Sequence, residues 1–176
     1  GESGKGCTPL FLAAVRGHTR IVQMLISAKG SVDQFGEEEN KFTPLYVAAL
    51  EGHLGIIELL ISANASLDLQ ALDGFTALGA ASFKGHLDAV NALVSAKCSL
   101  DLQKNDGATP LYAASQQGHL GVVNSLISAR ATVDPQADDG ATPLFAASAE
   151  GHLSVVKALT RSNADLTLAW TDPNTG

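Results

Sequence analysis

The sequence predicts an all-α solenoid of stacked helix-turn-helix units with projecting β-hairpin loops. A Thr-Pro-Leu string, or Thr-Ala-Leu in one case, begins at each of five threonines: Thr8, Thr43, Thr76, Thr109 and Thr142. These threonines are 35, 33, 33 and 33 residues apart, and a Gly-His pair follows each of them at the same offset. Apolar residues then recur at helical spacing. Self-similarity at a fixed period is the signature of repeat architectures, in which each unit stacks on its neighbours.

A short first helix is predicted at the start of each unit. The threonine suits the N-cap, because its hydroxyl can accept a hydrogen bond from an amide of the first turn. Proline suits the next position, where a helix has no use for its missing N–H. Small residues follow, such as Ala48-Ala49 and Ala114-Ser115, and they let a neighbouring helix come close. The glycine of the Gly-His pair is expected to end this helix in the left-handed conformation.

A second helix is predicted to begin near the histidine. Its apolar residues recur at helical spacing, for example at Ile56, Ile57, Leu60 and Ile61. A polar link follows, and three of the links contain an Asp-Gly pair, which is typical of a hairpin turn. These pairs are Asp73-Gly74, Asp106-Gly107 and Asp139-Gly140.

The repeated unit strongly resembles the ankyrin repeat, whose signature is Thr-Pro-Leu-His-x-Ala-Ala, then Gly-His, then Val-Val-x-x-Leu-Leu. The resemblance extends from about Gly6 to Leu168. It implies a single domain over residues 1–176 with five repeats, at about 6–40, 41–73, 74–106, 107–139 and 140–172. It also implies a scaffold and recognition module, with the concave face as the usual binding surface.

Two departures from the family pattern matter. The histidine of Thr-Pro-Leu-His is replaced in every repeat, by Phe11, Tyr46, Gly79, Tyr112 and Phe145. Aromatic packing is expected to take over its role, with a packing defect at Gly79. The first link, residues 34–41, is two residues longer than the others and contains Glu37-Glu38-Glu39, which predicts a larger and acidic hairpin tip.

Composition excludes several classes of partner. Apolar residues make up 45% of the chain and charged residues 16%, so it is expected to fold. The net charge of −7 argues against nucleic acid, which is bound largely through Lys and Arg. No run of 18 apolar residues occurs, so no membrane span is expected. Cys7 and Cys98 are too few for a disulfide framework, which favours a reducing, cytoplasmic setting.

The residues that could carry chemistry are better explained by the repeat itself. The Gly-His histidines recur one per repeat, too far apart for neighbours to share a zinc ion. Asp33, Asp68, Asp101 and Asp134 also recur, and each is expected to cap its own turn. No nucleophile with a base stands out. We therefore expect no enzyme activity, no catalytic or metal-binding residue, and no cofactor.

The candidate binding residues are those that vary between repeats at hairpin tips and on first helices. They are Phe42, Leu50, Leu72, Phe75, Phe83, Lys84, Asp106, Gln116, Gln117, Asp138, Asp139 and Glu150. The apolar members, in the first half of the chain, are expected to anchor a partner, and the acidic members to steer it. The alternative is that the phenylalanines only pack on neighbouring hairpins.

The leading functional hypothesis is a non-catalytic protein–protein interaction scaffold whose partner is another, unidentified protein. A second hypothesis is a structural repeat that stacks end to end into a filament, because the first repeat keeps a fully apolar set in its second helix. This set comprises Ile21, Val22, Met24, Leu25 and Ile26. A third is that the repeats are the targeting part of a longer enzyme.

Overall fold

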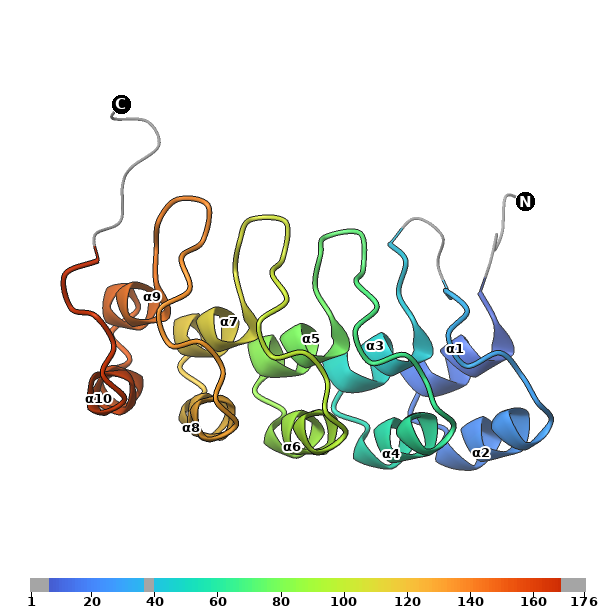
Figure 1. Ribbon diagram of the computed structural model, residues 1–176. Coiled ribbons are helices and arrows are strands. Elements are labelled where there is room, and N and C mark those ends of the chain that lie inside the picture. Colours follow the sequence, from blue (N-terminus) through green and yellow to red (C-terminus); the bar gives the residue numbers. More distant parts are fainter. Residues whose placement is uncertain (1–6, 37–39, 169–176) are drawn as a thin grey trace.

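The computed structural model describes residues 7–36 and 40–168, and these residues form ten α-helices in two parallel rows (Figure 1). The upper row holds the first helices: α1 (Pro9–Val15), α3 (Pro44–Leu50), α5 (Ala77–Lys84), α7 (Pro110–Gln116) and α9 (Pro143–Ala149). The lower row holds the second helices: α2 (Thr19–Ser27), α4 (Leu54–Ser62), α6 (Leu87–Ser95), α8 (Leu120–Ser128) and α10 (Leu153–Arg161). The predicted all-α repeat solenoid is confirmed.

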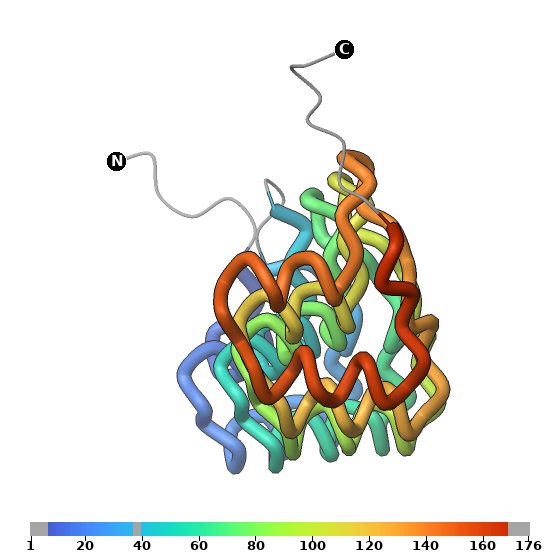
Figure 2. The backbone as a smooth tube through the Cα atoms, turned by 90° about the vertical axis from the view of Figure 1, so that its left-hand side faces the viewer, coloured from blue at the N-terminus to red at the C-terminus, as the bar shows by residue number. Residues whose placement is uncertain are grey.

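The helix pairs lie one behind another along the array. Figure 2 looks along the array from the C-terminal end and shows each pair offset slightly from the next. Loops between pairs project to one side, above the first helices (Figure 1). We call the surface formed by the loop tips and the exposed sides of the first helices the hairpin face. It is the face that the family resemblance predicts to bind.

The first helices begin and end as the sequence predicts. Each threonine hydroxyl accepts a hydrogen bond from the amide three residues later, as in Thr43, whose Oγ1 lies 3.0 Å from the Tyr46 amide nitrogen. The glycine after each helix has a left-handed backbone, with φ of 73° at Gly52 and 77° at Gly85. Glycine adopts this conformation without steric penalty, so the chain can turn sharply into the second helix.

The core runs continuously through all five pairs. Alanines of the first helices, such as Ala49 and Ala81, are fully buried, and so are branched residues of the second helices, such as Ile57 and Leu93. Small side chains on one row and larger ones on the other let the helices pack closely. This explains why the chain is rich in alanine and has few aromatic residues.

The Gly-His histidines join each repeat to the one before it. Each ring nitrogen Nε2 lies within hydrogen-bond distance of a carbonyl oxygen at the end of the preceding first helix. The distances are 3.3 Å for His53 and Val15, 3.1 Å for His86 and Leu50, 3.0 Å for His119 and Phe83, and 3.0 Å for His152 and Gln116. The imidazole also covers the glycine that ends that helix. The sequence alone predicts only that the second helix begins near each histidine.

The recurring link aspartates bond to the next repeat, so the expectation that they cap their own turns is wrong. Asp68 accepts hydrogen bonds from the amide and the hydroxyl of Ser99, at 2.9 and 2.6 Å. Asp33 does the same with Ser66, and Asp101 with Thr132. The donors are 31 or 33 residues further along the chain, in the next repeat, so the pattern within one repeat could not reveal them.

The projecting loops are hairpin-shaped but barely form strands. Each tip is closed by a main-chain hydrogen bond, such as the Lys104 N–H to the Ala108 carbonyl at 2.8 Å. Neighbouring tips are also joined, as by the Asn105 N–H to the Asp73 carbonyl at 2.9 Å. The tips therefore form a connected edge. The acidic tip predicted at Glu37-Glu38-Glu39 lies outside the described residues.

Candidate functional site

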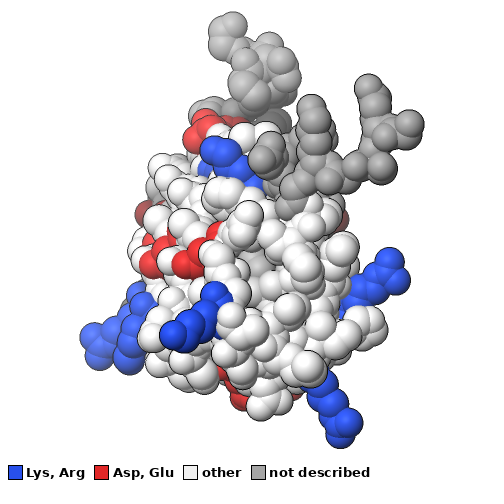
Figure 3. All heavy atoms as spheres, turned by 90° about the vertical axis from the view of Figure 1, so that its right-hand side faces the viewer, with Lys and Arg blue, Asp and Glu red and all other residues white. Residues whose placement is uncertain are grey.

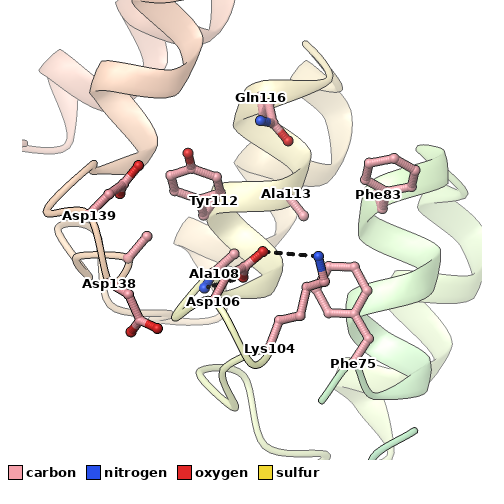
Figure 4. A pocket seen from close by; sticks show the side chains of 11 residues that line it. Phe75, Phe83, Lys104, Asp106, Ala108, Tyr112, Ala113, Gln116, Asp138 and Asp139 are labelled. Atoms are coloured by element: carbon pink, nitrogen blue, oxygen red, sulfur yellow. Dashed lines mark hydrogen bonds and ion pairs between the residues drawn. The ribbon is translucent and has the colours of Figure 1, made fainter. Parts of the chain in front are cut away.

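A pocket of about 260 Å³ opens on the hairpin face where the third and fourth repeats meet (Figure 4). Phe75 and Phe83 of the third repeat form one wall. Tyr112, Ala113 and Gln116 project from α7. The tips of the next two hairpins complete the lining with Lys104, Asp106, Ala108, Ala137, Asp138 and Asp139. We call this cavity the central pocket.

The pocket exists because one aromatic residue is replaced by alanine. Phe42, next to the N-cap threonine of its repeat, stacks on Tyr46 with ring centroids 4.5 Å apart and planes 6° apart. The equivalent residue of the fourth repeat is Ala108, so no ring covers Tyr112. The space that a phenylalanine would fill is left open between the hairpin tips.

Gly79 is not the packing defect that the sequence suggests. A Cβ atom at Gly79 would come within 2.8 Å of Cδ1 of Phe75. The phenylalanine ring of the third repeat therefore lies against the glycine backbone, where a larger residue would collide with it. Phe42 and Phe75 both pack within their own repeat and against the core, which keeps the packing alternative open for these two rings.

The pocket already contains one cation of the chain itself. The Lys104 Nζ lies 3.0 Å from Oδ2 of Asp106 and 5.4 Å from the centroid of the Phe75 ring. The lysine is thus held between a carboxylate and an aromatic face. Side-chain exposures of 31% for Lys104 and 59% for Asp106 leave the pair open to water, so it adds little to stability.

Charge at the mouth of the pocket is predominantly negative. Partial burial opposes ionisation of Asp106, but hydrogen bonds from Lys104 and from the Ala108 amide outweigh it and hold its pKa below the ordinary value. Burial, together with the charges of Asp139 and Asp106, raises the pKa of Tyr112. At neutral pH the pocket therefore combines ionised carboxylates with a protonated phenol that can donate a hydrogen bond.

The aspartates of the hairpin tips differ in their roles. Asp106 and Asp139 each accept a hydrogen bond from the amide two residues later, at 3.1 and 3.0 Å, and so stabilise their own turns. Asp138 is exposed, and its carboxylate makes no hydrogen bond or ion pair with the described part of the chain. It is the lining carboxylate with no structural task of its own.

Half of the predicted binding residues line the central pocket. These are Phe75, Phe83, Asp106, Gln116, Asp138 and Asp139. The others lie elsewhere on or near the hairpin face: Phe42 stacks on Tyr46, Leu50 packs half-buried against the core, and Leu72 is 58% exposed at a hairpin tip. Lys84, Gln117 and Glu150 are exposed at the ends of first helices.

Sequence reasoning missed two important lining residues, Lys104 and Tyr112. Lys104 stands at a tip position where the neighbouring hairpins have Ala71 and Ala137, so variation between repeats could have revealed it. Tyr112 was treated only as a replacement for the family histidine. Tyr112 is left uncovered because the residue four positions earlier is Ala108. Inspection of position 112 alone could not show this.

The molecule offers other surfaces as well. The N-terminal end of the array presents a mostly uncharged surface, with Lys, Arg, Asp and Glu side chains toward its edges (Figure 3). Three apolar residues are exposed in the first repeat: Leu12 by 47%, Ile21 by 48% and Met24 by 73%. Through residues 7–36 and 40–168, every helix is too short or too polar to cross a membrane.

The cysteines differ strongly in environment. Both are free thiols, Cys7 exposed and Cys98 buried. Burial, followed by the charge of Asp68, raises the pKa of Cys98 to about 12. The thiolate is the reactive form, so Cys98 is an unreactive core residue in the folded protein. Within the described residues, no three His, Cys, Asp or Glu side chains are grouped to hold a metal ion.

Comparison with known proteins agrees with the architecture. The family model described as ankyrin repeats (3 copies) matches residues 1–71, 55–137 and 77–169. No curated protein matches the sequence. Ankyrin repeats are, in general, protein–protein interaction modules. The matches extend over nearly the whole chain, which therefore belongs to the ankyrin-repeat family.

Proposed function

We propose that this chain is a non-catalytic protein-interaction module that binds its partner through the hairpin face, centred on the central pocket. The observation that carries the proposal is the pocket's composition. Two successive repeats build it from residues that differ between repeats, such as Phe83, Lys104 and Asp138. Residues that repeat maintain the fold, whereas these residues have no common role in it.

The lining has the character of an interaction hot spot. Binding energy concentrates in a few aromatic or long side chains that lie in a desolvated pocket with a polar rim. Phe83 and Tyr112 are half-buried and offer ring surface, and Gln116 supplies a polar group beside them. Both cysteines are unpaired, which supports a reducing and cytoplasmic setting for this module.

The test is a comparison of captured proteins. The chain would be used as bait in a cell extract in three forms: unchanged, with Phe83→Ala and Gln116→Ala, and with Glu58→Ala and Asp88→Ala. Glu58 and Asp88 are exposed on the second helices, away from the hairpin face, so the last variant is the matched control. We expect a partner that the control retains and the pocket variant loses by about 10-fold or more. Equal capture by all three forms would overturn the proposal.

A second candidate function is end-to-end self-association, favoured by the exposed Ile21 and Met24 at the N-terminal end. His18, unlike the four later histidines, has no carbonyl partner among the described residues. At the other end, within the described chain, nothing lies within 4 Å of the position of a Cβ on Gly151, where earlier repeats have the next histidine ring. Sedimentation velocity at increasing concentration should show larger species that Met24→Lys abolishes. A single monomeric species throughout would exclude it.

A further inference from the structure

The central pocket has the chemistry of a receptor for a cation. Its rim carries three carboxylates, and two of its walls present aromatic faces. We propose that it binds the side chain of an arginine or lysine in an extended, basic segment of the partner protein. The inference rests on the proposed function and adds the chemical class of the ligand.

Lys104 shows how the walls of the central pocket hold a cation. Its ammonium group is held by a carboxylate at 3.0 Å and by a ring face at 5.4 Å, both inside the pocket. A guest cation would meet the same two kinds of group around Tyr112, which stands between the phenylalanines of the third repeat and the aspartates of the last hairpin tip (Figure 4). Attraction between a cation and an aromatic face strengthens where water is excluded.

The charge balance leaves room for a second cation. Lys104 is the single basic residue in the lining, and it is paired with Asp106. The carboxylate of Asp138 has no partner among the described residues. The chain as a whole carries a net charge of −7. A basic segment would therefore be attracted at long range and find the unpaired carboxylate of Asp138 at the pocket.

The shape of the site favours an extended segment. Successive hairpin tips are joined by main-chain hydrogen bonds, such as the Asp138 N–H to the Asp106 carbonyl at 2.9 Å, and they form a continuous edge beside the first helices (Figure 1). A peptide lying along this edge can place one long side chain into the pocket while its backbone stays outside. Arginine and lysine are long enough to reach in while keeping the charged group at the carboxylates.

The experiment uses a random peptide library displayed on phage and selected on the full chain. Selected peptides would be synthesised with a fluorophore, and their affinity measured by polarisation. The basic residue would then be replaced by norleucine, which keeps length and removes charge. On the protein side, Asp138→Asn with Asp139→Asn removes charge but keeps the acceptor for the Ala141 amide. Glu58→Gln with Asp88→Asn removes the same charge from the second helices.

We expect the selected peptides to share an arginine or lysine. Its replacement by norleucine, or the pocket charge variant, should each weaken binding by about 10-fold, while the two together should weaken it little more than either alone. The outer control should change affinity by less than about 2-fold. Peptides without a shared basic residue, or fully additive effects, would overturn the inference.

The two proposals fail in different ways. Ala108→Phe fills the pocket without changing its charges. If Ala108→Phe abolishes binding but the charge variants do not, the hairpin face binds and the cation inference is wrong. If no selected peptide depends on either Ala108 or the aspartates, both proposals are contradicted.

Discussion

The second and fourth repeats have the same backbone fold, but their surfaces on the hairpin face differ. In the second repeat, Phe42 stacks on Tyr46 at a centroid distance of 4.5 Å, and the hairpin face is filled at that point. In the fourth, Ala108 replaces the phenylalanine, Tyr112 stays uncovered, and a pocket of about 260 Å³ opens. A single side chain at one repeat position therefore separates a packed surface from an open cavity.

The difference shows how this fold divides its tasks. Threonine caps and glycine turns are the same in every repeat, histidine bonds join each of the last four repeats to the one before it, and together they stabilise the array. The pocket depends on residues that break the pattern, so it can vary while the frame stays the same. Four predictions test how far the frame and the pocket are independent.

The largest effect is expected where the repeats are alike. Leu93 and Leu126 are fully buried at equivalent positions of the third and fourth repeats. Leu93→Ala and Leu126→Ala should each lower the free energy of unfolding by about 2–5 kcal/mol, because each leaves a cavity in the shared core. Urea unfolding measures this. Leu87→Ala, at a side chain that is 38% exposed, should cost less than either. A loss below about 1 kcal/mol at Leu93 would contradict a tightly packed frame.

The next effect concerns the position that distinguishes the repeats. Ala108→Phe should recreate the pair of stacked rings found in the second repeat and close the central pocket. Peptide or partner binding should fall about 30-fold, equivalent to about 2 kcal/mol, with the melting temperature nearly unchanged. Ala141→Phe places the same ring one repeat further on, outside the pocket lining, and serves as the control. Unchanged affinity for Ala108→Phe would show that the pocket is not the binding site.

A smaller effect is expected in the bonds between repeats. Asp101 accepts hydrogen bonds from both the amide and the hydroxyl of Thr132, at 3.0 and 2.7 Å. Asp134 accepts only from the amide of Asp165, at 3.1 and 3.2 Å, and faces another acid there. Asp101→Ala should therefore destabilise the protein by about 1 kcal/mol and Asp134→Ala by less. Hydrogen exchange of the fourth and fifth repeats would rank the two, and the reverse order would contradict this comparison.

The smallest effect on binding should come from the exposed acids. Asp138→Asn with Asp139→Asn should weaken binding by about 10-fold at low salt, largely by slowing association, and by less at high salt, because exposed charges are screened within about 10 Å at 0.1 M salt. Stopped-flow binding at several salt concentrations measures this. Dissociation should change less than association. A loss of less than about 2-fold at low salt would show that these carboxylates do not meet a cation of the ligand.

Much of the fold could be predicted from the sequence because its signals are local and repeated. Thr43 and Gly52 act through neighbours within a helical turn, so spacing alone revealed them. The bonds of His86 and Asp68 could not be found in this way, because their acceptor and donors lie one repeat away. The six predicted residues in the central pocket could be identified from the sequence because they differ from the residues at equivalent positions of the other repeats. Tyr112 and Lys104 could be identified as lining residues only from the structure, which brings Ala108, Phe75 and Asp106 close to them.

The bonds between repeats have a consequence for how such a chain can change over generations. Each internal repeat makes the same set on both sides. In the third repeat, His86 bonds to Leu50 of the second, and Phe83 bonds to His119 of the fourth. A gene duplication that inserted one whole unit would therefore find matching contacts on both of its faces. If a copy of the second unit were inserted between the third and fourth units, Phe75 and Phe83 would be separated from Tyr112. The array would lengthen without loss of order, and the cavity would vanish. The number of repeats can thus change with little loss of stability in this architecture. The cavity, in contrast, requires that the third and fourth repeats stay neighbours.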